Sequence, residues 1–115
     1  GMIKNNYGRI INISSIGAFK ADINVAYVSA KSGLVGATKA LANEMRKTGV
    51  SVNAIAPGPI YTDFFSGRTR EELSSETGFK IGETQDIANI VSFLCSDKAD
   101  HINGQVIHVN GGMYI

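Results

Sequence analysis

Residues 26–45, AYVSAKSGLVGATKALANEM, decide the fold, because they predict a long helix between two short apolar segments. Their apolar side chains recur at the three- and four-residue spacing of an amphipathic helix. Arg46 and Lys47 follow where cations favour the helix dipole, and Gly49 suits the position just after a helix end. The sequence therefore predicts a helix over residues 26–47.

Short apolar segments lie on both sides of this helix. Within residues 8–14, GRIINIS, a short and nearly continuous apolar run is formed by the β-branched residues Ile10, Ile11 and Ile13, which is typical of a strand buried on both faces. Residues 50–57, VSVNAIAP, predict a second strand, and residues 104–112, GQVIHVNGG, a third. A second helix is predicted over residues 83–97. Strands that alternate with helices imply right-handed crossovers and a parallel sheet.

The segment between the second strand and the second helix has a different character. Residues 62–82 are polar and glycine-bearing, and only residues 70–75 suggest a short helix. A connection of this length is usually a lid or a binding loop. Its three phenylalanines either line an acyl-binding surface or pack the segment onto the body. Thr84 is expected to cap the helix that follows.

The totals describe one globular domain over residues 1–115, with 43% hydrophobic and 18% charged residues. The net charge is +1 and no basic cluster is present, which argues against a nucleic acid or a membrane as a partner. Cys95 is the single cysteine, so no internal disulfide forms and a reducing, cytoplasmic location is expected. No apolar run is long enough to span a membrane. Gly1 resembles a tag scar before a start at Met2.

The side chains that suggest chemistry lie near the start of the long helix. Tyr27 and Lys31 are four residues apart and share one face of that helix. A free tyrosine has a pKa of about 10, and a nearby ammonium stabilises its phenolate, which suits the pair for general acid–base catalysis. Ser14 and Ser15 follow the first strand, at the sheet edge where open α/β sheets bind ligands. On spacing alone, the ordinary alternative is a solvated pair of side chains.

Several motifs together resemble the short-chain dehydrogenase/reductases. They are GRIINISS at residues 8–15, Tyr-x-x-x-Lys at residues 27–31 and VNAIAPGPIYT at residues 52–62, in the family's order. The ending GQVIHVNGGMYI looks especially like that of the 3-oxoacyl-[acyl-carrier-protein] reductases. The resemblance implies a partial Rossmann-like α/β fold with about three parallel strands and two main helices. It also implies that the N-terminal nucleotide-binding half of the family fold is missing.

The resemblance implies a role for each matched residue. Tyr27 corresponds to the proton donor and Lys31 to its partner, which also contacts the cofactor ribose. Ser15 corresponds to the catalytic serine, with Ser14 left as an alternative because the Ser-to-Tyr spacing is about one residue short. Segment 62–82 corresponds to the substrate lid. The cofactor contacts implied are Tyr27, Lys31, Pro57, Gly58, Ile60 and Thr62.

The implied function is NAD(P)-dependent reduction of a ketone or a 3-oxoacyl thioester, with NAD and NADP both left open. The family's glycine-rich phosphate-binding turn has no match, because Gly111 and Gly112 follow the last strand. The chain alone is therefore expected to bind no dinucleotide, and the alternative is an inactive remnant with a structural role. The resemblance also implies a homo-oligomer, a dimer or a tetramer.

Three further features carry weaker expectations. Gly33 and Gly36 are expected to let the long helix lie close to the sheet, the cofactor or a partner helix. Asn53 and Asn110 are expected to tie loops together. The two histidines lack neighbours of metal-ligand type, so no metal site is expected.

Overall fold

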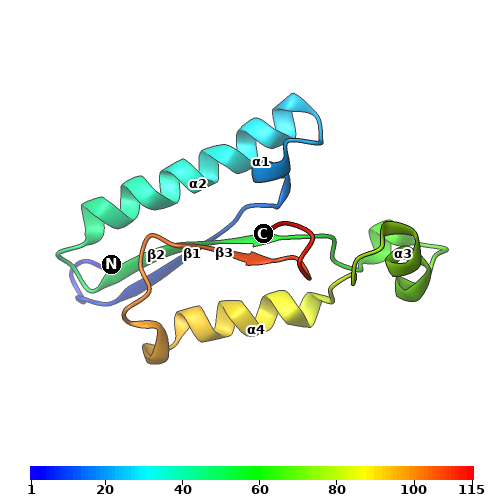
Figure 1. Ribbon diagram of the computed structural model, residues 1–115. Helices are drawn as coiled ribbons and strands as arrows, with labels where there is room; N and C mark the ends of the chain where they lie inside the picture. Colours follow the sequence, from blue (N-terminus) through cyan, green and yellow to red (C-terminus); the bar gives the residue numbers. More distant parts are fainter.

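Three parallel strands form the centre of the computed structural model, which describes residues 1–115 (Figure 1). The strands are β1 (Gly8–Ile13), β2 (Val50–Pro57) and β3 (Val106–Val109). They lie in the order β1-β2-β3, with Gly8 beside Val50 and Ala54 beside Val106. The predicted partial α/β fold is therefore confirmed. The third strand is shorter than predicted, because the glycines that flank it leave the extended conformation with positive φ.

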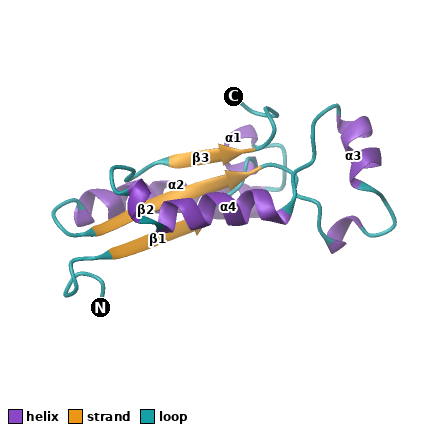
Figure 2. Cartoon of the chain, turned by 90° about the horizontal axis from the view of Figure 1, so that it is seen from below, coloured by secondary structure: helices purple, strands orange, loops and turns teal.

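Two helices cover the two faces of this sheet (Figure 2). They are α2 (Val25–Met45) and α4 (Thr84–Cys95). Side chains of β2 alternate between them, so Val52 packs with Ala42 of α2, whereas Ile55 packs with Leu94 of α4. Seven of the eight β2 residues are buried, which explains why this strand reads as an apolar run. None of the helices is long and apolar enough to cross a membrane.

Segment 62–82 projects beyond the carboxyl ends of the strands (Figure 2). It contains the 3-10 turn η1 (Asp63–Phe65) and helix α3 (Arg70–Thr77), which confirms the short predicted helix and extends it by two residues. Thr69 caps α3 through a reciprocal capping box with Glu72. Phe64 is 87% exposed, so it does not pack the segment onto the body.

The observed helix ends correct three of the predictions. Helix α2 ends at Met45, and Gly49 lies beyond it without a positive φ, so Gly49 is not a left-handed helix terminator. A side chain at Gly49 would collide with the Asn6 carbonyl, and this close approach explains the glycine. The residue that precedes α4 as its cap is Glu83, not Thr84, and its backbone N–H donates to Asp86 Oδ2 at 2.8 Å.

Besides η1, two short elements were not predicted from the sequence. Helix α1 (Gly17–Lys20) forms one turn directly after the serines that follow β1, and the 3-10 turn η2 (Asp97–Ala99) follows α4. Both are too short to produce a periodic pattern. Helix α1 packs against α2, so it fixes the path of the chain between β1 and the start of α2.

Candidate active site

The loops after the three strands meet at one edge of the sheet, and backbone hydrogen bonds tie them together. The Ile16 N–H, after β1, donates to the Pro57 carbonyl at the end of β2 at 2.8 Å. The Gly58 N–H donates to the Val109 carbonyl at the end of β3 at 2.9 Å. A Cβ at Gly58 would lie 2.8 Å from Asn110 Cβ, so this glycine is required for the close approach of the two loops. These contacts therefore fix the positions of the three loops relative to one another.

The two serines after β1 make different contacts. The Ser14 hydroxyl donates to the Lys31 backbone carbonyl at 2.8 Å, which attaches the end of β1 to α2. The Ser15 hydroxyl oxygen accepts the Gly17 N–H at 3.0 Å, and this bond leaves the hydroxyl hydrogen free to donate elsewhere. Ser14 is thus held by a structural bond, whereas Ser15 keeps a donor for another group.

Tyr27 lies in the first turn of α2, next to Ser15. The Asn24 side chain caps this turn by accepting the Tyr27 N–H at 2.9 Å, which fixes the position of the tyrosine backbone. A Cβ built at Gly17 would lie 3.3 Å from Tyr27 Cε1 and 3.4 Å from Ser15 Oγ, so both side chains border the same position. Tyr27 is 37% exposed, which leaves its ring accessible.

Lys31 completes the group one helical turn further on. Its ammonium nitrogen lies 5.8 Å from the centre of the Tyr27 ring and donates to the Ile13 carbonyl at 3.0 Å. An ammonium carries three donors, so two remain for other acceptors. The bond to Ile13 holds the lysine at the carboxyl end of β1. Chemically, the group offers a phenol and a hydroxyl donor that border one position, with a positive charge next to the phenol ring.

The other predicted cofactor contacts lie further along the chain after β2. Pro57 is joined to the serine loop, whereas Ile60 forms an isolated parallel bridge with Gly82 at the base of segment 62–82. Ile60 lines a hollow of about 520 Å³ between α4 and the end of β3, and Ser15, Tyr27 and Lys31 do not line it. Thr62 is exposed at the start of η1.

The donors present fit one end of a nicotinamide dinucleotide and not the other. The two remaining Lys31 donors suit the hydroxyls of a ribose. No glycine precedes the first turn of α2, where Asn24 already accepts one of the amides. A pyrophosphate needs free amides at a helix N-terminus, so the chain offers no cradle of that kind after β1. No group of three or more His, Cys, Asp and Glu side chains is placed to hold a metal ion.

Two residues of this site were missed from the sequence. Asn24 could have been found, because asparagine just before a helical pattern is a capping signal. Gly17 could not, since its role depends on the approach of Tyr27 from a different element.

A parallel sheet with a helix on each face, and with a Tyr–Lys pair and a serine at its carboxyl edge, places the chain in the class of Rossmann-like α/β proteins. The chain belongs to the short-chain dehydrogenase/reductase family: the sequence model described as enoyl-(acyl carrier protein) reductase matches residues 1–114.

Individual relatives of this chain are named 3-oxoacyl-[acyl-carrier-protein] reductases. The 3-oxoacyl-[acyl-carrier-protein] reductase FabG of Aquifex aeolicus is 44% identical over 98% of this chain and 48% of its own length. The FabG of Rickettsia felis is 46% identical over 97% of this chain and 48% of its own length. The crystal structure of the 3-oxoacyl-[acyl-carrier protein] reductase of Brucella melitensis superposes with a TM-score of 0.90 at 30% identity. The superposition covers all of this chain and 45% of the Brucella melitensis chain. The chain thus spans about half the length of these relatives, in agreement with a C-terminal half.

Proposed function

We propose that this chain is the catalytic half of an NAD(P)-dependent oxidoreductase that reduces a ketone or a 3-oxoacyl thioester. The observation that carries the proposal is that Tyr27 and Ser15 border the same position beside Gly17, with the Lys31 ammonium 5.8 Å from the centre of the Tyr27 ring. The names of the relatives at 44–46% identity support a 3-oxo substrate, whereas the description of the family model names enoyl reduction. A phenol and a hydroxyl on neighbouring side chains suit a carbonyl oxygen, which can accept both of their hydrogens.

In this proposal each of the three side chains has a separate role. The nicotinamide supplies the hydride when it is bound. The Ser15 hydroxyl donates a hydrogen bond to the substrate carbonyl oxygen, and the Tyr27 phenol gives that oxygen its proton. Lys31 stabilises the phenolate that remains and holds a ribose hydroxyl with a donor that Ile13 leaves free. The backbone after β2, at Pro57 and Gly58, and the residues Ile60 and Thr62 form the border of the nicotinamide site.

Segment 62–82 is proposed to be the substrate lid of the single domain. It projects beyond the carboxyl edge of the sheet, where the candidate site lies. Its Phe64 is 87% exposed and contacts the Phe65 ring, edge to face, at 5.2 Å between centroids. An apolar surface of this kind suits the acyl chain of a thioester. The single cysteine, Cys95, supports the proposal that the protein works in the cytoplasm.

The experiment that tests the proposed function is a chimera. Residues 1–115 would replace the matched half of the Aquifex aeolicus reductase, so that all candidate catalytic groups come from this chain. We expect the chimera to oxidise the reduced dinucleotide with a 3-oxoacyl thioester and not with an enoyl thioester. A chimera that folds and binds the dinucleotide but reduces neither substrate would contradict the proposal.

The second candidate function is a remnant with a structural role, and one observation favours it. The chain offers no cradle for the pyrophosphate, so the main anchoring interactions of the dinucleotide are not provided by it. A calorimetric titration of the purified chain with NADPH distinguishes between the two candidate functions of this chain. No binding is expected. Saturable binding in the micromolar range would make the remnant hypothesis wrong.

We also propose that the chain forms a homo-oligomer through the outer face of α2. A Cβ at Gly33 or Gly36 would meet nothing within 4 Å, so neither glycine serves packing against the sheet. Each costs the helix about 1 kcal/mol relative to alanine, which a close helix–helix contact would offset. Only 18 of the 115 residues are buried, and Val25 on the same helix is 82% exposed. Exposed apolar surface of this kind is more typical of a protein–protein interface than of a surface that stays in contact with water.

Replacing Gly36 by leucine should therefore convert the oligomer to a smaller species without unfolding the chain. The monomer has open space at this position, whereas a partner helix in close contact would collide with the new side chain. Light scattering after size-exclusion chromatography measures the mass, and circular dichroism checks the fold. Ser75→Leu, on exposed α3, is the matched control. A monodisperse wild-type monomer would contradict the proposal.

A further inference from the structure

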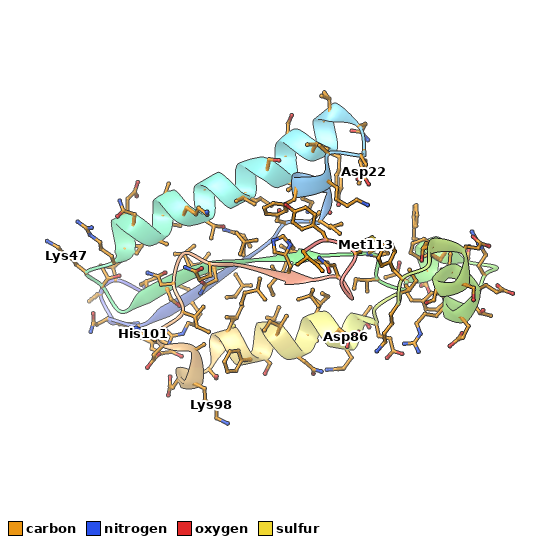
Figure 3. All side chains as sticks on the ribbon, viewed as in Figure 1. Asp22, Lys47, Asp86, Lys98, His101 and Met113 are labelled. Carbon is orange, nitrogen blue, oxygen red and sulfur yellow. The ribbon has the colours of Figure 1, made fainter.

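A polar hollow lies at the opposite end of the sheet from the candidate active site. Its volume is about 520 Å³, and its lining comes from the amino ends of β1 and β2, the turn after α2 and the residues after α4. Figure 3 labels Lys47 and His101 at this end of the molecule, whereas Asp22, just before the turn that carries Tyr27, lies at the far end. None of the catalytic candidates contributes to the hollow, so its function is separate from theirs.

Two buried polar atoms in this hollow have no hydrogen-bond partner. They are Arg9 Nε, on a side chain that is 8% exposed, and Ser51 Oγ, on a residue that is 6% exposed. Arg9 and Ser51 are direct neighbours in the register of β1 and β2, so their side chains leave the same face of the sheet. An unpaired buried polar group is costly, and two of them side by side indicate a missing partner that contacts both.

The rest of the Arg9 guanidinium is already occupied. One terminal nitrogen donates to the Gly8 carbonyl at 3.1 Å, and the other pairs with Asp100 and lies 4.0 Å from Asp97. The Tyr7 ring lies against the guanidinium at 4.5 Å from its carbon. These contacts hold the side chain in place, and they leave the buried Nε–H without a partner.

Apart from the two carboxylates, Asp97 and Asp100, the free side-chain groups around the hollow are mainly donors. Asn6 and Asn103 both line it, and each uses its amide oxygen to accept a backbone N–H, from Gly49 and Val52, which leaves the amide nitrogens as donors. Arg46 also lines the hollow and forms no salt bridge. The opposing charges are Asp97 and Asp100, whose side chains are largely exposed and therefore screened by water.

We propose that this hollow binds a small oxyanion, a phosphate or a carboxylate, through Arg9 Nε–H, the Ser51 hydroxyl and Arg46. Such a ligand has only acceptors, which match the donors that line the hollow. One oxygen bridges Arg9 Nε and Ser51 Oγ, and Arg46 supplies the positive charge that Arg9 shares with Asp100. The alternative is a single ordered water between the same two atoms, which needs no charge from Arg46.

The test is a titration of the full chain with inorganic phosphate and, separately, with acetate, at constant ionic strength set by sodium chloride. We expect saturable chemical-shift changes at Arg9 and Ser51 with at least one of them. Ser51→Ala and Arg46→Gln should each weaken binding by roughly tenfold. Saturation with phosphate alone would assign the site to phosphate groups, and saturation with acetate alone would assign it to carboxylates.

Matched controls keep the test decisive. Lys39→Gln removes the same charge from the exposed side of α2, and Ser92→Ala removes an exposed hydroxyl from α4. Both should bind like the wild type. If Ser51→Ala does not fold, Arg46→Gln alone carries the test, because Arg46 is exposed. The proposal is wrong if neither anion saturates, which leaves the bridging water only. It is also wrong if Lys39→Gln weakens binding as much as Arg46→Gln.

Discussion

Tyr27→Phe should lower the rate of 3-oxoacyl reduction by the chimera with the Aquifex aeolicus reductase by about 10²–10⁴-fold, the usual contribution of a general acid. Phenylalanine keeps the ring beside Gly17 and the capped first turn of α2, since Asn24 contacts only the backbone of residue 27. The hydroxyl that gives the carbonyl oxygen its proton is the only group removed. The loss should therefore appear in kcat, measured by oxidation of the reduced dinucleotide at saturating substrate.

Tyr61→Phe is the matched control for this experiment. Tyr61 is also 37% exposed, but its hydroxyl donates to the Arg68 carbonyl at 2.8 Å, within segment 62–82. Its loss should change kcat by much less than tenfold. Dinucleotide binding should be retained in both variants, because Lys31 and the backbone after β2 are unchanged. If Tyr27→Phe kept a tenth or more of the activity, another group would have to be the proton donor.

The strands, the two long helices and the Tyr–Lys pair could be predicted because each leaves a local pattern. Strand β2 is apolar along its length because both faces are covered, and α2 is amphipathic because one side packs on the sheet. The spacing of Tyr27 and Lys31 places them on one face whatever surrounds the helix. Such features depend on residues within a few positions of one another, so a single sequence carries them.

The remaining features depend on contacts between distant segments. Ser14 and Ser15 form different hydrogen bonds because of the positions of α2 and α1 in the fold. The sequence of the two serines does not indicate which hydroxyl keeps a free hydrogen. Gly49 reads as a helix terminator, but its real constraint is the Asn6 carbonyl, 43 positions earlier along the chain. The partnerless atoms of Arg9 and Ser51 likewise exist only once β1 and β2 are paired.

Asn53 gives the second large effect, because one buried side chain holds two backbone groups of a distant turn. Its amide nitrogen donates to the Ile102 carbonyl at 2.9 Å, and its oxygen accepts the Gln105 N–H at 3.0 Å. The expectation that Asn53 ties a loop is thereby confirmed. Asn53→Leu keeps the branching and the number of heavy atoms of the side chain, and it leaves both backbone groups without a partner. We expect the free energy of unfolding to fall by roughly 2–6 kcal/mol, at about 1–3 kcal/mol for each group.

Urea denaturation followed by circular dichroism measures this loss, and Asn43→Leu is the control. Asn43 is exposed on α2 and its side chain forms no hydrogen bond, so that variant should change stability by less than about 0.5 kcal/mol. The turn that Asn53 holds leads directly into β3, whose pairing with β2 begins at Val106. Amide exchange should therefore accelerate in β3 before it does in β1. An Asn53→Leu chain as stable as the wild type would mean that water or a shifted turn satisfies both groups, and that the register of β3 does not depend on Asn53.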